Sequence, residues 1–342
     1  MMKYLYILMF ILVGAISCSD QNKTEYADDS DITLKVCTYN LWCAHSRTKK
    51  ANSNSDFPTQ RFWKPSSGAM ASLVSDLNCD IYAFQEVGDS IYGKKGAETS
   101  LKKMLGGGYE WKFWSNSDGK VVTATSGKLG YTPGICYKKS VVAFVDGGIF
   151  WLGGNPAKPE FVRTESFNPE RGDAHRACAW ARLRHVPSGK IFYFLSTHLD
   201  TRTLNDVFYP CVNEENCKNL MSHADKNVVP KGTPSIIAGD FNTTFSHDGY
   251  IDHIAAVENY SHKWENAYLI AREKGLLNTA AFTFATTNSI YEKTGSTIID
   301  HILVDGFDVL KYNINQKKYM TEDGTWHYPS DHFPVVVKLK FK

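Results

Sequence analysis

The sequence lacks several features that would indicate particular classes of protein. None of its eight cysteines forms a CxxC pair, which argues against a zinc site built from thiolates. No internal repeat, low-complexity tract or Pro/Gly-rich linker is visible beyond residue 31, so we expect a single domain over residues 32–342. With 43% hydrophobic and 22% charged residues, a chain of 342 residues can bury a large core.

Net charge is also nearly absent. The formal charge is +2, and it falls to +1 if residues 1–17 are removed, because Lys3 is the only charged residue among them. A protein this close to neutrality has no global field that attracts nucleic acid.

The first 17 residues have the pattern of an export signal. Lys3 precedes an apolar run, and small residues then lead to Cys18. The apolar run is too short for a committed membrane span. Cleavage before a cysteine resembles processing of a bacterial lipoprotein, although Ala15 stands where leucine is usual. An ordinary signal peptide followed by a chance cysteine is the alternative.

We therefore expect a lipoprotein signal peptide over 1–17 and a flexible, lipid-anchored tether over 18–31. The tether is polar and has too little apolar material to fold. The exported protein would be held at the outer membrane by lipid on Cys18, on the periplasmic or cell-surface side. In an oxidising compartment Cys211 and Cys217 can pair, and the alternative is two free, partly buried thiols.

Short apolar runs, rich in β-branched and aromatic residues, predict strands that outnumber helices. The expected strands are Ile32–Tyr39, Ile81–Gln85, Gly134–Tyr137, Ala177–Leu183, Ile191–Thr197, Ser235–Ala238, Ile298–Val304 and Val335–Phe341. Helical spacing predicts helices over Gly68–Leu77 and Asp252–Lys274. The irregular alternation favours an α/β sandwich of two sheets over a doubly wound sheet.

Polar residues follow several of these runs, where side chains leave the core. They are Asn40, Gln85-Glu86, Thr197-His198, Asp240-Phe241-Asn242, Asp300-His301 and Asp331-His332. Burying several uncompensated carboxylates is too costly to occur repeatedly without a cation or partner. Carboxylates and carboxamides with few imidazoles select Mg²⁺ or Mn²⁺ rather than zinc.

These motifs, in this order, resemble those of the endonuclease/exonuclease/phosphatase superfamily. They read Thr38-Tyr39-Asn40, Gln85-Glu86-Val87, Thr197-His198-Leu199-Asp200, Gly239-Asp240-Phe241-Asn242, Ile299-Asp300-His301-Ile302 and Ser330-Asp331-His332. The resemblance implies a deoxyribonuclease-I-like fold. This is a four-layer α/β sandwich of two mixed sheets flanked by helices, with the site in a groove between sheet edges.

The resemblance also implies a role for each group around a metal ion and a phosphate. Glu86 would be the main ligand of Mg²⁺ (or Mn²⁺), with Asn40 and Asp331 beside it. Arg176 resembles an arginine common in bacterial members and would clamp a phosphate. Its alternative is a surface arginine paired with an acidic neighbour.

Five further residues would carry the chemistry. Asp240 would orient or deprotonate the attacking water, and Asn242 would hold the phosphate. His332 would bond a phosphoryl oxygen while Asp300 sets its tautomer. His198 falls where deoxyribonucleases, sphingomyelinases and phosphatases of the superfamily carry a histidine, which argues against the abasic-site endonuclease branch.

The sequence thus predicts a metal-dependent hydrolase of phosphate esters that acts outside the inner membrane. A secreted nuclease remains the alternative, although the near-zero charge and the lack of Lys/Arg-rich loops beside the motifs argue mildly against it. A binding protein without catalysis is a third reading, disfavoured because every expected acidic and histidine position is filled. No protein partner is implied.

Replacing Cys18 tests the lipid anchor. We expect Cys18→Ser to move the protein from the membrane fraction to the soluble fraction without loss of activity, because the tether separates the lipid from the domain. The measurement is fractionation together with acyl labelling. A Cys18→Ser protein that stays with membranes and keeps its label would contradict the lipoprotein interpretation.

Overall fold

The structure is a computed structural model that describes most of the chain from residue 32 onward. The described residues are 32–41, 63–87, 105–122, 133–160, 175–201, 203–204, 207–208, 210–244, 260–278, 282–285, 295, 297–320, 324 and 326–342. The expected signal peptide, the tether and Cys18 lie outside them.

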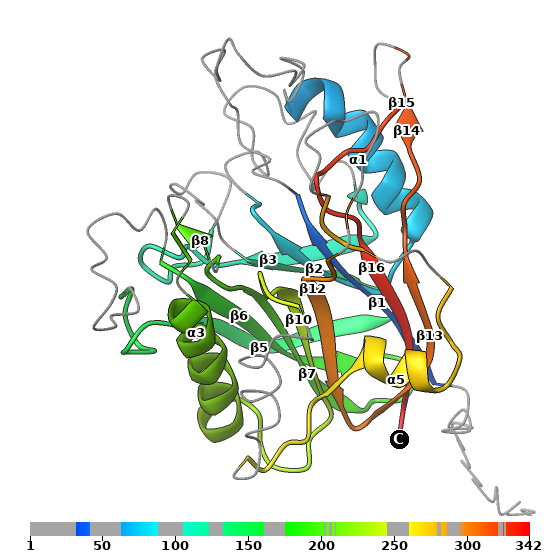
Figure 1. The fold of residues 1–342 in the computed structure, drawn as a ribbon. Coiled ribbons are helices and arrows are strands. Elements are labelled where there is room, and N and C mark those ends of the chain that lie inside the picture. Colours follow the sequence, from blue (N-terminus) through cyan, green and yellow to red (C-terminus); the bar gives the residue numbers. More distant parts are fainter. Residues whose placement is uncertain are drawn as a thin grey trace, which may run out of the picture.

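Two mixed six-stranded sheets form the centre of the molecule (Figure 1). The first sheet has the order β13 (Phe307–Ile314), β16 (Val335–Phe341), β1 (Thr33–Asn40), β2 (Ile81–Gln85), β4 (Gly134–Lys138) and β3 (Tyr109–Phe113). The second has the order β11 (Glu265–Asn266), β12 (Asp300–Asp305), β10 (Ser235–Asp240), β7 (Ile191–His198), β6 (Ala177–His185) and β5 (Val142–Trp151). Two further pairs are β8 (Thr203–Leu204) with β9 (Val207–Phe208), and β14 (Tyr319–Met320) with β15 (Trp326–His327).

Alternate side chains of the central strands enter different cores. In β7, Phe192 and Phe194 face the space between the sheets, whereas Tyr193 and Leu195 face the outside of the second sheet. Both faces are buried, which explains why these strands read as continuous apolar runs rather than as alternating ones. A strand of this kind requires covering layers on both sides.

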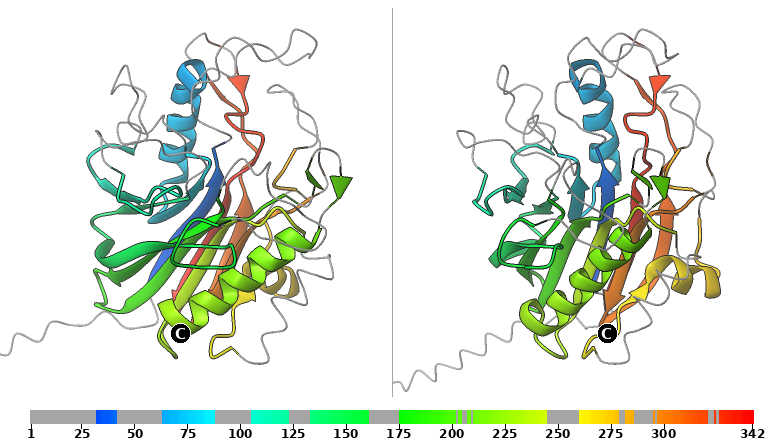
Figure 2. Two further views of the ribbon diagram at one scale, coloured as in Figure 1. Left: turned by 90° about the vertical axis from the view of Figure 1, so that its left-hand side faces the viewer. Right: turned by 60° about the vertical axis from the view of Figure 1, so that its left-hand side comes forward.

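Helices supply the two outer layers. Helix α1 (Trp63–Leu77) packs Met70, Leu73, Val74 and Leu77 against the outer face of the first sheet. Helix α3 (Pro210–His223), followed by the π-helical turn η4 (Ala224–Val228), covers the outer face of the second sheet (Figure 2). The short helix α5 (Ala267–Glu273) packs beside β12 and β13. The four-layer sandwich of deoxyribonuclease-I type is therefore confirmed.

All eight strands expected from the sequence are present, but the helix expectations were less accurate. The long helix expected over Asp252–Lys274 is wrong in its described part, where only 267–273 is helical and 265–266 pairs with β12. Helix α3 was not expected. Cys217, at its centre, carries a free buried thiol, while the side chain of Cys211 lies outside the described residues. None of the helices in the described ranges is long and apolar enough to span a bilayer.

Strand register brings the motif residues to one end of the sandwich. In the first sheet β1 and β2 run parallel, so Asn40 pairs with Gln85. In the second sheet Asp240 pairs with His198 on parallel β7 and with Asp300 on antiparallel β12. Because carboxyl ends of parallel strands share an edge, polar residues at these ends converge.

Gly239 shows how closely the strands approach each other beside Asp240. It pairs with Thr197, and a Cβ on Gly239 would lie 2.2 Å from the Thr197 carbonyl oxygen. We expect Gly239→Ala to lower the free energy of unfolding by about 1–3 kcal/mol, because backbone atoms must shift to admit the methyl group. Unfolding in urea measures this change in the free energy of unfolding.

The control for this prediction is Gly107→Ala, where the added Cβ meets nothing within 4 Å. We expect that variant to be as stable as the parent protein. Equal unfolding midpoints for the two variants would contradict a steric requirement for glycine in β10.

Candidate active site

The first sheet contributes an amide and a carboxylate. Asn40 ends β1, and Glu86 follows the last residue of β2. The Asn40 Nδ2 group donates to Glu86 Oε1 over 3.3 Å. Glu86 has a φ of +52°, a left-handed conformation that costs a non-glycine residue on the order of 1–3 kcal/mol. Strain of this kind is retained where a side chain must point in one particular direction.

Asp240 is the centre of the contribution from the second sheet. Its side chain is almost completely buried. Asn40 Nδ2 donates to Asp240 Oδ2 over 2.9 Å, which joins the ends of the two sheets. The backbone N–H of Asn242 donates to the other carboxylate oxygen, Oδ1, over 2.8 Å.

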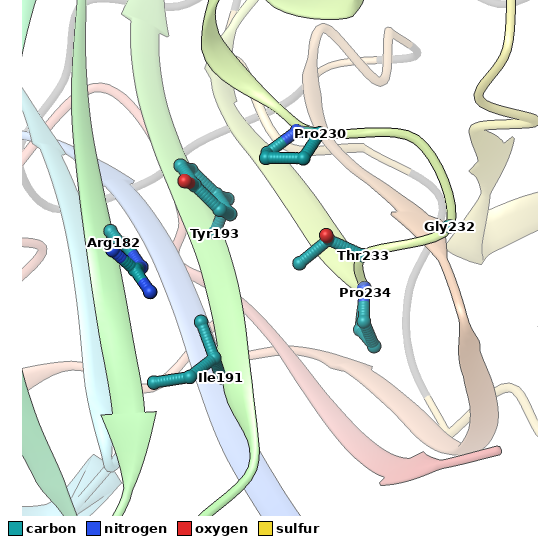
Figure 3. A pocket seen from close by; sticks show the side chains of 7 residues that line it. All are labelled: Arg182, Ile191, Tyr193, Pro230, Gly232, Thr233 and Pro234. Atoms are coloured by element: carbon teal, nitrogen blue, oxygen red, sulfur yellow. The ribbon is translucent and has the colours of Figure 1, made fainter.

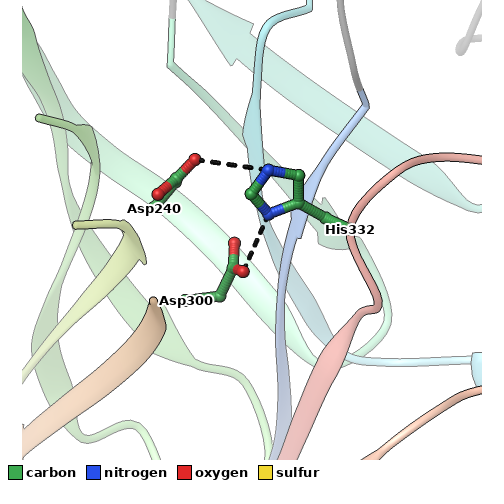
Figure 4. A group of neighbouring side chains, drawn as sticks. All are labelled: Asp240, Asp300 and His332. Atoms are coloured by element: carbon green, nitrogen blue, oxygen red, sulfur yellow. Dashed lines mark hydrogen bonds and ion pairs between the residues drawn. The ribbon is translucent and has the colours of Figure 1, made fainter. Parts of the chain in front are cut away.

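His332 lies between two carboxylates, as Figure 4 shows. Its Nδ1 is 2.8 Å from Asp300 Oδ2, and its Nε2 is 3.7 Å from Asp240 Oδ2. The Asp300 bond fixes the orientation of the ring and directs Nε2 toward Asp240. The three residues come from the start of β12, the end of β10 and the loop before β16.

Burial and the charges of neighbouring groups shift the pKa values of Asp240 and His332. Burial raises the pKa of Asp240 to about 7, and the charge of Asp300 adds to this while His332 opposes it. For His332, burial acts to lower the pKa, but the carboxylates of Asp300 and Asp240 outweigh it and raise the pKa to about 10. At neutral pH the imidazole of His332 is therefore charged, and the carboxyl group of Asp240 is partly ionised.

His198 occupies the other side of Asp240, with its Nε2 3.4 Å from Asp240 Oδ2. Burial, reinforced by the positive charges of Arg176 and His332, lowers its pKa well below the ordinary value. Its Nδ1 is buried and has no hydrogen-bond partner among the described residues. His198 is therefore neutral, in contrast to His332.

Arg176 and Asn242, two further predicted site residues, are each hydrogen-bonded to the loop that follows β7. Arg176 Nε donates to Asp200 Oδ1 over 2.7 Å, and its side chain is only 14% exposed, so it is paired but is not a surface arginine. Asn242 has a φ of +50°, and its amide donates to the Leu199 carbonyl over 2.9 Å. A direct contact of either residue with phosphate stays a prediction.

The residues present fit a hard divalent cation. Ser330 Oγ donates to the Asn40 carbonyl over 2.7 Å and lies 3.4 Å from Asp331 Oδ1, which ties the loop that carries Asp331 to the backbone of Asn40. Four carboxylates, those of Glu86, Asp240, Asp300 and Asp331, are linked through the contacts described above. One charged imidazole offsets them, since Arg176 already pairs with Asp200, so the cluster has an excess of negative charge.

A second set of possible ligand atoms lies within 4.8 Å, on Asp240, Asp300 and His332. The raised pKa of His332 means that, without a metal, the imidazole carries a proton on each nitrogen at neutral pH. The assignment of Asn40, Glu86 and Asp331 as ligands of the cation stays a prediction.

Two hydroxyl groups that support the site were not predicted from the sequence. Ser330 connects Asn40 and Asp331, and Thr283 Oγ1 accepts from the N–H groups of Ile299 and Asp300 over 3.0 and 3.2 Å. Ser330 belongs to a motif, which was a usable signal. Nothing in the sequence marked Thr283, because its contact depends on the fold.

A separate hollow of about 480 Å³ (Figure 3) lies near the starts of β7 and β10, whereas the candidate site lies at the ends of these strands. It is lined by Arg182, Ile191, Tyr193, Pro230, Gly232, Thr233 and Pro234. Because Ile191 starts β7 whereas His198 ends it, the hollow is remote from the cluster and includes none of its residues.

Comparison with known proteins agrees with this geometry. No curated protein sequence matches the chain. An endonuclease/exonuclease/phosphatase family protein from Bacteroides thetaiotaomicron has 23% identity and a TM-score of 0.68, over 91% of this chain and 98% of its own. The mannosyl-6-phosphatase of Bacteroides thetaiotaomicron VPI-5482 has 23% identity and a TM-score of 0.65, over 90% and 100%.

A more distant structure is the human Nocturnin catalytic domain with bound sulfate, with 16% identity, a TM-score of 0.59, and coverage of 91% and 95%. At such identities these likenesses show the fold alone. The family model described as Endonuclease/Exonuclease/phosphatase family, however, matches residues 37–332. This match spans most of the chain and the whole cluster, and the protein therefore belongs to the endonuclease/exonuclease/phosphatase family.

Proposed function

We propose that the protein is a Mg²⁺- or Mn²⁺-dependent hydrolase of phosphate esters that acts outside the inner membrane. The observation that supports this best is the chain of contacts from Asp300 through His332 to Asp240. It places a charged proton donor 3.7 Å from a carboxylate of near-neutral pKa. General acid and base groups of this kind accelerate the hydrolysis of a phosphate ester.

Asp240 is suited to accept the proton of the attacking water. A base is most effective when its pKa lies near the working pH, and burial raises the pKa of Asp240 to about 7. Asn40 Nδ2 and the Asn242 N–H group hold its two oxygens in place. The carboxylate is therefore oriented before the substrate binds.

His332 and His198 are suited to donate hydrogen bonds to phosphoryl oxygens. Their Nε2 atoms both face Asp240, at 3.7 and 3.4 Å, so a phosphate beside Asp240 would lie within reach of both rings. His332 carries positive charge, which strengthens its bond as negative charge grows in the transition state. His198, being neutral, can donate a hydrogen bond without adding a third positive charge beside Arg176 and His332.

Asn40, Glu86 and Asp331 would hold the cation. A bound Mg²⁺ or Mn²⁺ would supply Lewis-acid stabilisation of charge on the phosphoryl oxygens. The strained backbone at Glu86 supports its assignment as the main ligand, because the left-handed conformation turns this carboxylate toward Asn40.

Small phosphate esters are the substrates that we favour. The near-neutral chain has no charge excess to hold a long polyanion. The likeness in fold to a mannosyl-6-phosphatase supports a sugar phosphate as one member of the class. The intact network around Asp240 argues against a binding protein without catalysis. A secreted nuclease remains the alternative that the assay below tests.

A substrate panel with metal removal tests this proposal. We expect hydrolysis of sugar phosphates or bis-p-nitrophenyl phosphate, complete loss of activity in EDTA, and recovery with Mg²⁺ or Mn²⁺, because the proposed ligands are oxygen donors. Plasmid DNA, RNA and sphingomyelin complete the panel. Undiminished activity in excess EDTA would exclude the metal mechanism, and a strong preference for plasmid DNA or RNA would favour the nuclease.

Variants of three residues separate metal binding from charge stabilisation. Glu86→Gln removes one ligand charge, so we expect a defect that shrinks as Mg²⁺ is raised. His332→Ala removes a donor that acts mainly in the transition state, so we expect kcat to fall by on the order of 10²-fold at every metal concentration. Asp300→Asn should give a milder loss, because the ring remains but loses its charge partner.

The measurement is a metal titration of kcat for each variant, with folding checked by circular dichroism. Rescue of His332→Ala by metal as fully as Glu86→Gln, or an Asp300→Asn enzyme equal to the parent, would contradict this division of roles.

A further inference from the structure

Helix α3 carries three asparagines spaced three residues apart, Asn213, Asn216 and Asn219. This spacing keeps them on neighbouring positions of one helix face. Asn213 and Asn216 are only 2% and 1% exposed, beside the apolar contacts that α3 makes with the second sheet. Asparagine is a poor helix former, and a buried amide is tolerated only where it is hydrogen-bonded.

The Asn213 amide bridges two loops that leave the second sheet. Its Nδ2 donates to the Asp200 carbonyl over 2.6 Å and to the Phe241 carbonyl over 2.8 Å. Asp200 follows the end of β7, and Phe241 follows the end of β10. A single NH₂ group therefore spans the exits of two adjacent strands.

Those two loops carry much of the candidate site. His198 lies two residues before Asp200, and Asp240 and Asn242 flank Phe241. The loops are also tied directly to each other, since the Leu199 N–H donates to the Asp240 carbonyl over 2.9 Å.

Asn216 holds the same loop from a second direction. Its Oδ1 accepts from the Asp200 N–H over 2.9 Å, so the backbone of Asp200 is fixed at both its donor and its acceptor. The Asp200 carboxylate in turn pairs with Arg176.

We propose that Asn213 is a positioning residue of the active site: its amide fixes the spacing between the ends of β7 and β10. The inference rests on the proposed hydrolase function. Without the Nδ2 donor, two carbonyl oxygens lose a partner under a packed helix, and the loops relax to satisfy them. His198 and Asp240 then move relative to each other. Displacements of even about 1 Å can lower a rate by up to about 10²-fold.

Asn219 provides a matched control on the same helix. Its Nδ2 also donates to two carbonyls, those of Leu152 and Gly153, each over 3.1 Å. These lie just after β5, and neither belongs to a loop that carries His198 or Asp240. Asn213→Leu and Asn219→Leu therefore remove equal numbers of hydrogen bonds from one helix, and only the first removes bonds to the loops that carry His198 and Asp240.

The experiment compares these variants with the Mg²⁺-loaded parent protein, below the lowest unfolding temperature of the set. We expect both variants to lose stability, Asn213→Leu the more because its amide is the more deeply buried, whereas Asn213→Leu alone lowers kcat by about 10-fold or more with KM changed less than twofold. Asn213→Ser keeps one hydrogen-bond donor, so we expect its kcat to lie between those of the parent and of Asn213→Leu. We also expect faster amide hydrogen exchange in 199–201 and 241–244 for Asn213→Leu only.

Several results would overturn the inference. They are an unchanged kcat in Asn213→Leu, an equal loss of kcat in Asn219→Leu, or unchanged exchange in both loops. If Asn213→Leu does not fold, Asn213→Ser decides by the same readouts. If the parent hydrolyses none of the panel substrates, the proposed function fails, and hydrogen exchange still decides whether Asn213 holds the two loops.

Discussion

A buried hydrogen bond between Asn40 and Asp240 joins the two sheets at the candidate active site. These residues are 200 positions apart in the chain, and each ends a central strand. Their contact requires that β1 and β10 pack face to face through the core between the sheets, which Leu34, Val36, Ile236 and Ala238 fill. The site is thus a direct product of how the sandwich closes.

The electrostatics of the cluster follow from this burial. The carboxylates of Asp300, Asp240 and Asp331 raise the pKa of His332 to about 10, and burial raises the pKa of Asp240 to about 7. The remaining negative charge is what a divalent cation would neutralise. One arrangement therefore accounts for a carboxyl group with a near-neutral pKa, a charged imidazole and a local concentration of negative charge.

Support around these groups comes from the backbone conformation and from neighbouring polar side chains. The left-handed backbone at Glu86 and Asn242 aims two side chains from strand ends. The hydroxyl of Ser330 ties the loop before β16 to Asn40. Helix α3 adds the asparagine contacts behind the second sheet. Such secondary contacts set the precision of a site whose principal groups come from six different strands or loops.

The sequence by itself determined the strand runs, the sandwich and the positions of the motif residues. Runs such as Phe192–Leu195 are apolar on both faces, and a strand of that kind can exist only between covering layers. The polar residues at the ends of these runs could therefore be predicted to form a site. Helix α3 could not be predicted from the sequence, because asparagines, which are typical of loops, interrupt its apolar residues. Only the fold shows that the Asn213 amide is bonded to the carbonyls of Asp200 and Phe241.

Only the tertiary structure decided which histidine is charged, since His198 and His332 are alike in sequence and differ in the carboxylates that surround them. It also decided that Arg176 pairs with Asp200, and that Asp252–Lys274 is not one long helix. The physical reason is that hydrogen bonding, desolvation and charge coupling depend on distances between residues far apart in the chain, whereas periodicity records only which face of a strand or helix is buried.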